Sequence, residues 1–208
     1  MSEALFSYNS DIGKNAYMNW RTDKKDQTHN LYVLASDFAE GVTTMINAVL
    51  LDNRDKKADA LIMPILYSID QSIELYIKAI IRLLEELSGG PISNYKHHDI
   101  AMLKNTLVGK IREKQTTTKG LEKHLKPVSD FIDELYSKIK CTGENGKDVI
   151  KIDFARYPFD TEGNPHFYIE EPENVVIDVE NLSSKFEEIR NCLESLYLTY
   201  EAEKENLT

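Results

Sequence analysis

Cysteine, glycine and proline are all scarce in this chain of 208 residues. Its two cysteines, Cys141 and Cys192, stand far apart and outside any metal-ligand spacing, which argues against a disulfide framework or a zinc site. We therefore expect no metal and no cofactor. Only nine glycines and six prolines, beside 41% hydrophobic and 29% charged residues, argue against a disordered chain and indicate a folded, helix-rich protein. Unpaired cysteines also suit a reducing compartment, and we expect a cytoplasmic protein.

Basic residues are outnumbered, since 25 lysines and arginines face 35 acidic residues and leave a net charge of -10. Such a chain repels a phosphate backbone as a whole, so nucleic-acid binding would need a local basic patch or a charged partner. The N-terminus lacks a basic start followed by an apolar stretch, and no run approaches the ~20 apolar residues of a membrane span. We expect a soluble protein with no membrane association.

Apolar residues recur at helical spacing through most of the chain. Residues 1–28 lack this period, and we expect them to form an arm that packs on the body through Trp20. Residues 29–205 are predicted to form a single helical domain, with helices that begin near residues 28, 64, 99, 125 and 182. The fold class predicted is all-α, an antiparallel bundle of about five helices. The helix that ends near residue 87 is apolar around most of its circumference, which predicts a central position.

The last helix has the strongest period, because its apolar residues are spaced alternately by four and three from Leu182 to Tyr200. That spacing suits either an antiparallel bundle or a dimer seam, and we expect a homodimer. Between the helices, "VIKIDF" and "HFYIEE" alternate in polarity and are separated by the turn "TEGNP". This pattern predicts a small β-hairpin inserted at about residues 145–178.

A line of polar residues crosses the most apolar helix: Gln71, Glu74, Lys78 and Arg82 lie three or four positions apart, within and just after "SIDQSIELYIKAII". They share one helical face, and Glu74 with Lys78 has the favourable orientation of an i,i+4 pair. One interpretation is a solvated ladder worth a few tenths of a kcal/mol per pair. The other is a buried pairing, which must be fully hydrogen-bonded and which either fixes the packing or marks a site.

Two adjacent histidines precede a helix start in "YKHHDI". His97 and His98 cannot both point the same way, which argues against a joint metal site, and Asp99 is predicted to cap the helix. A structural helix start with one packed histidine is one interpretation. In the other, His98 and Asp99 contact an arginine or a phosphate.

The segment "FARYPFD" places Arg156 between aromatic residues, with Asp160 at its end. It is either a turn held by a salt bridge or a cation displayed for a ligand. The sequence has no glycine-rich phosphate loop, no nucleophile elbow and no His-Glu zinc motif.

In combination these motifs are more specific. A long helix with "PILYSIDQSIELYIKAI", a glycine break, "KHHDIAML", and "RYPFD" before a last long helix resemble the HEPN superfamily over residues 30–200. The resemblance implies an all-helical bundle that often dimerises. It also implies a role in prokaryotic toxin–antitoxin, abortive-infection or other phage-defence systems, frequently with action on RNA.

One family motif is missing. Ribonuclease members of the superfamily carry an arginine and a histidine separated by four to six residues on the late helix, whereas Arg190 has no histidine after it. The leading hypothesis is therefore a HEPN-like component that interacts with RNA, an antitoxin or another defence-system protein. The alternatives are an active ribonuclease toxin with a non-standard Arg/His/Glu site, and a purely structural dimeric module. The catalytic candidates are Glu74, Lys78, His98 and Arg156, and the ligand- or RNA-binding candidates are Gln71, Arg82, Asp99, Tyr157 and Asp160.

Overall fold

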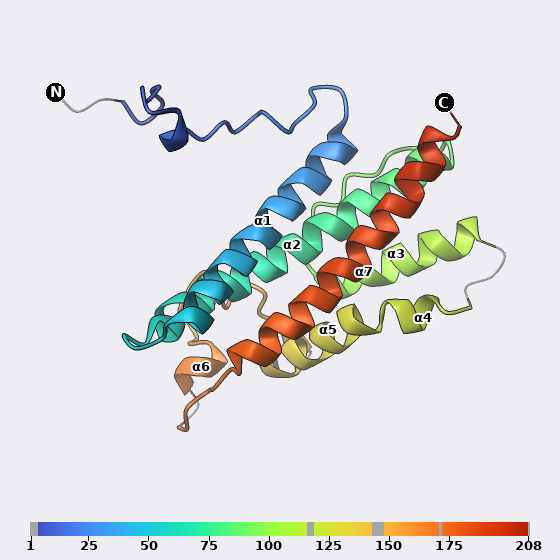
Figure 1. The fold of residues 1–208 in the computed structure, drawn as a ribbon. Coiled ribbons are helices and arrows are strands. Elements are labelled where there is room, and N and C mark those ends of the chain that lie inside the picture. The colour runs from blue at the N-terminus through green and yellow to red at the C-terminus, as the bar shows by residue number, and fades with distance from the viewer. Residues whose placement is uncertain (1–3, 116–118, 143–147, 171, 208) are drawn as a thin grey trace.

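Two long antiparallel helices form the first half of the bundle. The computed structural model of the chain describes residues 4–115, 119–142, 148–170 and 172–207. In it, α1 (Gln27–Leu51) and α2 (Lys57–Leu87) lie side by side (Figure 1). Asp26 caps α1 by accepting a hydrogen bond from the backbone N–H of His29 at 2.8 Å. The helix α2 begins seven residues before Pro64, so this proline lies inside the helix and does not open it.

The central position predicted for α2 is confirmed. This helix packs against α1, α3 (Ile100–Lys114) and α7 (Val179–Glu205), while α4 (Leu121–His124) and α5 (Lys126–Ile139) complete the bundle. Apolar side chains of α2 are buried around most of its circumference, and this burial makes it the core of the fold. The prediction of an all-α helical bundle with a small β element is confirmed.

The apolar stripe of the last helix is used within the chain. Leu182, Phe186, Ile189 and Leu193 are all buried in the core that α7 shares with the other helices. They therefore serve the bundle, and a homodimer would need a different surface. The hypothesis that this seam holds a partner is not compatible with this packing.

The β element is smaller than expected and lies earlier in the chain. Strands β1 (Lys140–Thr142) and β2 (Asp148–Ile150) pair antiparallel, with Lys140 opposite Ile150, and the turn between them lies outside the described residues. The second predicted strand, "HFYIEE", is wrong, because Phe167–Glu170 form the short helix α6. His166 is buried and Phe167 packs on the core beside it, and inward-facing neighbours suit a helical turn better than a strand. The turn predicted at residues 161–165 is confirmed, with Gly163 at a φ of +85°.

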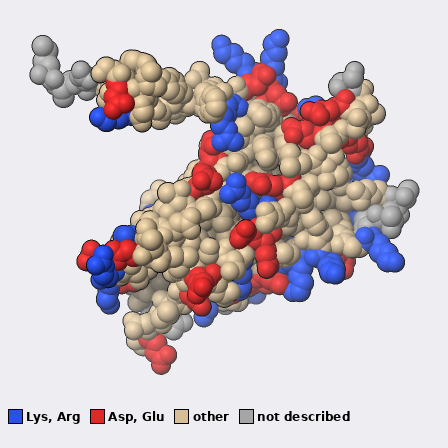
Figure 2. Space-filling view, viewed as in Figure 1, with Lys and Arg blue, Asp and Glu red and all other residues tan. Residues whose placement is uncertain are grey.

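The N-terminal arm does not show the packing expected of it. Trp20 is 79% exposed, and the aromatic and apolar side chains before it are exposed as well. In Figure 1 the arm leaves the bundle at the start of α1, and Figure 2 shows that most of its surface is uncharged. The contacts that hold it are polar and lie near its end: Arg21 pairs with Asp37 at 2.6 Å, and the backbone N–H of Asp23 donates to Asn30.

One helix of the described residues, α1, has the length and mean hydropathy of a membrane span. Its inward face packs on α2 within the bundle. One such helix does not assign the chain to a membrane.

Candidate functional site

The buried Glu74 carboxylate on α2 contacts two other predicted site residues. One is Lys78 on the same helix, and the other is His98 in the loop before α3. Glu74 is 3% exposed, and its Oε1 accepts a hydrogen bond from the Lys78 Nζ at 2.8 Å. The His98 Nδ1 lies 3.0 Å from the same oxygen and 3.1 Å from Oε2. We call Glu74, Lys78 and His98 the polar centre. The Lys78 side chain is only 13% exposed, so the solvated-ladder interpretation is wrong and the pair is a buried one.

His98 faces both the protein and the solvent. Because an ionised carboxylate only accepts hydrogen bonds, Nδ1 must carry the hydrogen that Glu74 receives. The side chain is 60% exposed, and among the described residues Nε2 has no hydrogen-bond partner. In a neutral imidazole this leaves a lone pair on Nε2 at the surface, in the orientation that a general base or a hydrogen-bonding ligand group requires.

A second buried glutamate holds the loop that carries His98. Glu85 follows Lys78 on α2. It accepts hydrogen bonds from the Ser93 backbone N–H and the Tyr95 hydroxyl, both at 2.9 Å. The Lys110 Nζ of α3 lies 3.3 Å away. Burial alone would raise the pKa of Glu85, but the bonds from Ser93, Tyr95 and Lys110 outweigh it and lower the pKa.

Asp99 caps α3, as the sequence predicted. Its Oδ1 accepts from the backbone N–H groups of Ala101 at 2.9 Å and Met102 at 3.1 Å. The hydroxyl of Tyr136, on α5, donates to the same oxygen at 2.8 Å. Burial and the Asp99 carboxylate raise the pKa of Tyr136, so this hydroxyl keeps its proton and remains a donor. These bonds fix the start of α3 directly after His98.

Asp70 lies one turn before Glu74 and was not singled out from the sequence. Burial, followed by the nearby Glu74 charge, raises the pKa of Asp70 to about 7, while Arg156 and a hydrogen bond from Gln71 act in the opposite direction. Asp70 therefore connects the polar centre electrostatically to the Arg156 segment. It also places a carboxyl beside the site that changes its protonation near neutral pH.

We expect Asp70→Asn to stabilise the protein near pH 8 and to leave it almost unchanged near pH 4. The pKa of Asp70 is raised from 3.8 to about 7 on folding, so between these values the folded state binds a proton that the unfolded state lacks. The stability contribution of this group is therefore present below the unfolded pKa and is lost as the pH rises through the folded pKa. Since Asp70 is only partly buried, we expect a gain of about 2 kcal/mol in the free energy of unfolding at pH 8.

Urea unfolding of both proteins at the two pH values measures this difference. Asp133→Asn, at an exposed position of α5, is the matched control and should give no pH-dependent gain. A gain for Asp70→Asn that is the same at both pH values would contradict the prediction.

The Arg156 segment is a turn held by a salt bridge, although not the one expected. Asp160 pairs with Lys151, and its carboxylate accepts the backbone N–H groups of Glu162 at 2.9 Å and Asn164 at 2.8 Å. The Lys151 ammonium, the largest cause, and these bonds lower the pKa of Asp160. Arg156 is exposed and lies over the ring of Tyr157, with its guanidinium carbon 5.8 Å from the ring centre.

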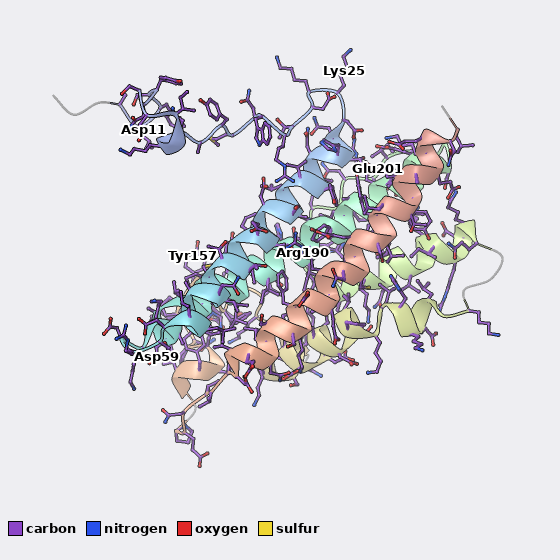
Figure 3. All side chains as sticks on the ribbon, in the orientation of Figure 1. Asp11, Lys25, Asp59, Tyr157, Arg190 and Glu201 are labelled. Carbon is purple, nitrogen blue, oxygen red and sulfur yellow. The ribbon has the colours of Figure 1, made fainter. Side chains whose placement is uncertain are left out.

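Two other candidates from the sequence, Arg82 and Gln71, lie outside the polar centre. Arg82 belongs to the far end of α2, where its Nε lies 3.6 Å from Glu86. Gln71 contributes through its hydrogen bond to Asp70. Arg190, at the position where the family motif was sought, reaches from α7 toward α1 (Figure 3), pairing with Glu194 at 3.0 Å and Glu40 at 3.6 Å. The Arg190 guanidinium is therefore engaged in ion pairs within the bundle.

Two pockets lie near the short helix α6, and the residues that line both of them are apolar. They measure about 470 and 350 Å³ and share a lining that contains none of the three polar-centre residues. The shared lining consists of Leu66, Phe154, Phe167, Val175, Val176 and Ile177. The polar centre is thus separate from these hollows, with His98 presented at the surface. Figure 2 shows acidic and basic side chains interspersed over the face formed by α1 and α7, without a broad basic patch there.

No protein-family model matches the chain, and neither the curated proteins nor the solved structures contain a match.

Proposed function

We propose that this chain is a HEPN-like protein that interacts with RNA at the polar centre, as a cytoplasmic component of a prokaryotic defence or stress system. The observation that supports the proposal most is the arrangement of Glu74, Lys78 and His98, in which a buried carboxylate holds an exposed imidazole by one nitrogen. A histidine needed only for packing would not leave 60% of its side chain in solvent. The resemblance of the motif order to that of HEPN proteins is the reason for proposing RNA as the ligand.

The distribution of charges favours RNA binding through a few defined contacts over nonspecific binding to the phosphate backbone. The chain carries a net charge of -10, so a phosphate must be drawn by individual cations. Arg156 is exposed and makes no ion pair among the described residues, and the outer nitrogen of His98 is free to accept a hydrogen bond from a ligand hydroxyl. Binding through a few such groups predicts a shallow salt dependence, because few counterions are released.

Cleavage of RNA is the second candidate, and the orientation of His98 favours it. With Nδ1 donating to Glu74, Nε2 can accept the proton of a ribose 2′-hydroxyl. The 2′-oxygen would then attack the adjacent phosphorus, the bond from phosphorus to the 5′-oxygen would break, and that oxygen would take a proton from water or an acid. Arg156 is the cation available to the phosphate oxygens. This reaction needs no metal.

Replacing His98 with alanine tests both functions. We expect the affinity for a fluorescein-labelled single-stranded RNA to fall about tenfold, which corresponds to the loss of one charge-assisted hydrogen bond. The free energy of unfolding should change by less than about 1 kcal/mol, because the side chain is largely exposed. Fluorescence anisotropy measures the affinity, urea unfolding the stability, and gel electrophoresis of total RNA and tRNA the cleavage.

His97→Ala is the matched control, since it removes the neighbouring imidazole, whose ring packs near Tyr95 and not on Glu74. Equal RNA affinity of wild type and His98→Ala would exclude the polar centre as the binding site. Cleavage by the wild type that is lost in both His98→Ala and Arg156→Ala would establish the ribonuclease. Absence of cleavage by the wild type would remove that candidate and leave binding.

We also propose that the protein is a homodimer, as the resemblance implies. Since the apolar stripe of α7 is occupied within the chain, the dimer surface must lie elsewhere. Light scattering of the wild type tests this directly, and a monomer at all concentrations used for RNA binding would exclude the dimer. An antitoxin or another defence-system protein is the alternative partner, and affinity capture from the native host tests for it.

A further inference from the structure

An exposed aromatic segment lies between β2 and α6. Tyr157 is 58% exposed and Phe159 is 51% exposed, and Pro158 separates them. Exposed aromatic side chains keep apolar surface in contact with water, and a ligand with a complementary face can cover that surface.

The backbone of this segment is held in place although its rings are exposed. The Tyr157 N–H donates to the Asp153 carbonyl at 3.1 Å, and the Tyr157 carbonyl accepts from the Tyr168 hydroxyl at 3.4 Å. The Pro158 carbonyl accepts from the backbone N–H of His166, which is buried. Proline also restricts the residue before it to extended conformations. The ring of Tyr157 is therefore presented by a fixed backbone, which lowers the entropy lost when a ligand packs on it.

A cation accompanies this ring. The Arg156 guanidinium lies 5.8 Å from the ring centre of Tyr157, within cation–π range. The Arg156 charge also acts to lower the pKa of Asp70, which lies one turn before Glu74 on α2. An aromatic ring with an adjacent arginine offers one surface for a planar base and a cation for the phosphate that follows it.

We propose that Tyr157 is a base-stacking residue: the exposed ring takes an unpaired nucleobase of single-stranded RNA, and Arg156 binds the adjoining phosphate. This inference rests on the proposed RNA function and specifies its substrate as unpaired RNA. Bases inside a duplex are stacked on their neighbours and do not offer a free face. The ring therefore selects single strands, loops or ends over double-stranded RNA.

The test compares two probes and three variants. The probes are a fluorescein-labelled oligouridine and an abasic ribose-phosphate oligomer of the same length. We expect Tyr157→Ala to weaken oligouridine binding by about tenfold, within the range of one lost base stack, and to leave binding of the abasic oligomer unchanged. Tyr157→Phe retains the ring and should bind both probes like the wild type. Tyr17→Ala removes a similarly exposed tyrosine of the arm, 53% exposed, and is the matched control.

The outcomes separate this inference from the proposed function. If the wild type binds oligouridine and Tyr157→Ala binds it equally well, RNA binding stands and the stacking role is overturned. If both probes weaken equally in Tyr157→Ala, the ring does not contact a base, and the inference is again overturned. If the wild type binds neither probe, the proposed function fails and this inference with it. A far-UV spectrum and a melting curve of each variant show that the comparison is between folded proteins.

Discussion

Replacing Glu74 with alanine is expected to lower the free energy of unfolding by about 3–4 kcal/mol. The loss arises because Lys78, whose side chain is 13% exposed, would keep its charge in a nearly buried place without the carboxylate 2.8 Å away. Breaking one half of a buried ion pair costs far more than removing a solvated one. Chemical unfolding monitored by circular dichroism measures the change.

Two further variants identify the cause. Glu74→Leu combined with Lys78→Met removes both charges and keeps most of the volume, so the double variant should recover much of the lost stability. Glu113→Ala, at a glutamate whose side chain is 75% exposed, should cost less than about 1 kcal/mol. A loss below 1 kcal/mol for Glu74→Ala would mean that the pair is solvated and would contradict the buried polar centre.

Replacing Glu85 with alanine is expected to cost about 3 kcal/mol and to release the loop that carries His98. Glu85 is 3% exposed and accepts from Ser93 and Tyr95, with Lys110 as its cationic partner. Its removal leaves the Ser93 backbone N–H and a partly buried ammonium without their acceptor. Chemical unfolding measures the loss, and hydrogen exchange of residues 88–99 measures the release.

Tyr95→Phe serves as the graded comparison, because it removes one of the three donors and leaves the carboxylate satisfied by the other two. It should cost about 1 kcal/mol and change exchange little. If Glu85→Ala left the exchange of residues 88–99 unchanged, Glu85 would not be the anchor of this loop. The pKa of Glu85 is lowered by its bonds, so its contribution should also be present above its unfolded pKa and be lost as the pH falls through the lowered folded value.

The helices were predictable because each carries its own apolar period. The stripe of α2 and that of α7 both point to a packed core, and the structure buries them. The β element was predicted less well. Alternating polarity over "HFYIEE" is also compatible with a short helix when two neighbouring residues face inward, and the sequence gives no means to choose.

The packing expected for the N-terminal arm was not found. Trp20 favoured packing because a large aromatic side chain is usually buried, but burial needs a surface that receives it. The structure leaves Trp20 exposed and holds the arm only by polar contacts near Arg21. The sequence identifies the apolar residues of an arm, whereas the surface that covers them depends on tertiary or quaternary contacts.

The polar centre was predictable in part. Spacing alone pairs Glu74 with Lys78, and the resemblance adds His98. Asp70 had a signal that was available, since it lies four positions before Glu74 and like charges at that spacing repel one another. Tyr136 had none, because its contact with Asp99 joins two helices that are far apart in sequence. Distances between elements depend on packing and not on local pattern.

We propose that RNA contacts this protein at His98 and at the Arg156 segment. Photocrosslinking of an oligouridine that carries 4-thiouridine, followed by peptide mapping with mass spectrometry, tests the claim most directly. We expect the crosslinks to fall at His98 and within residues 154–160, and to disappear in the His98→Ala, Tyr157→Ala double variant. Crosslinks confined to the arm or to the lysines of α3 and α5, or no crosslink at all, would contradict the account.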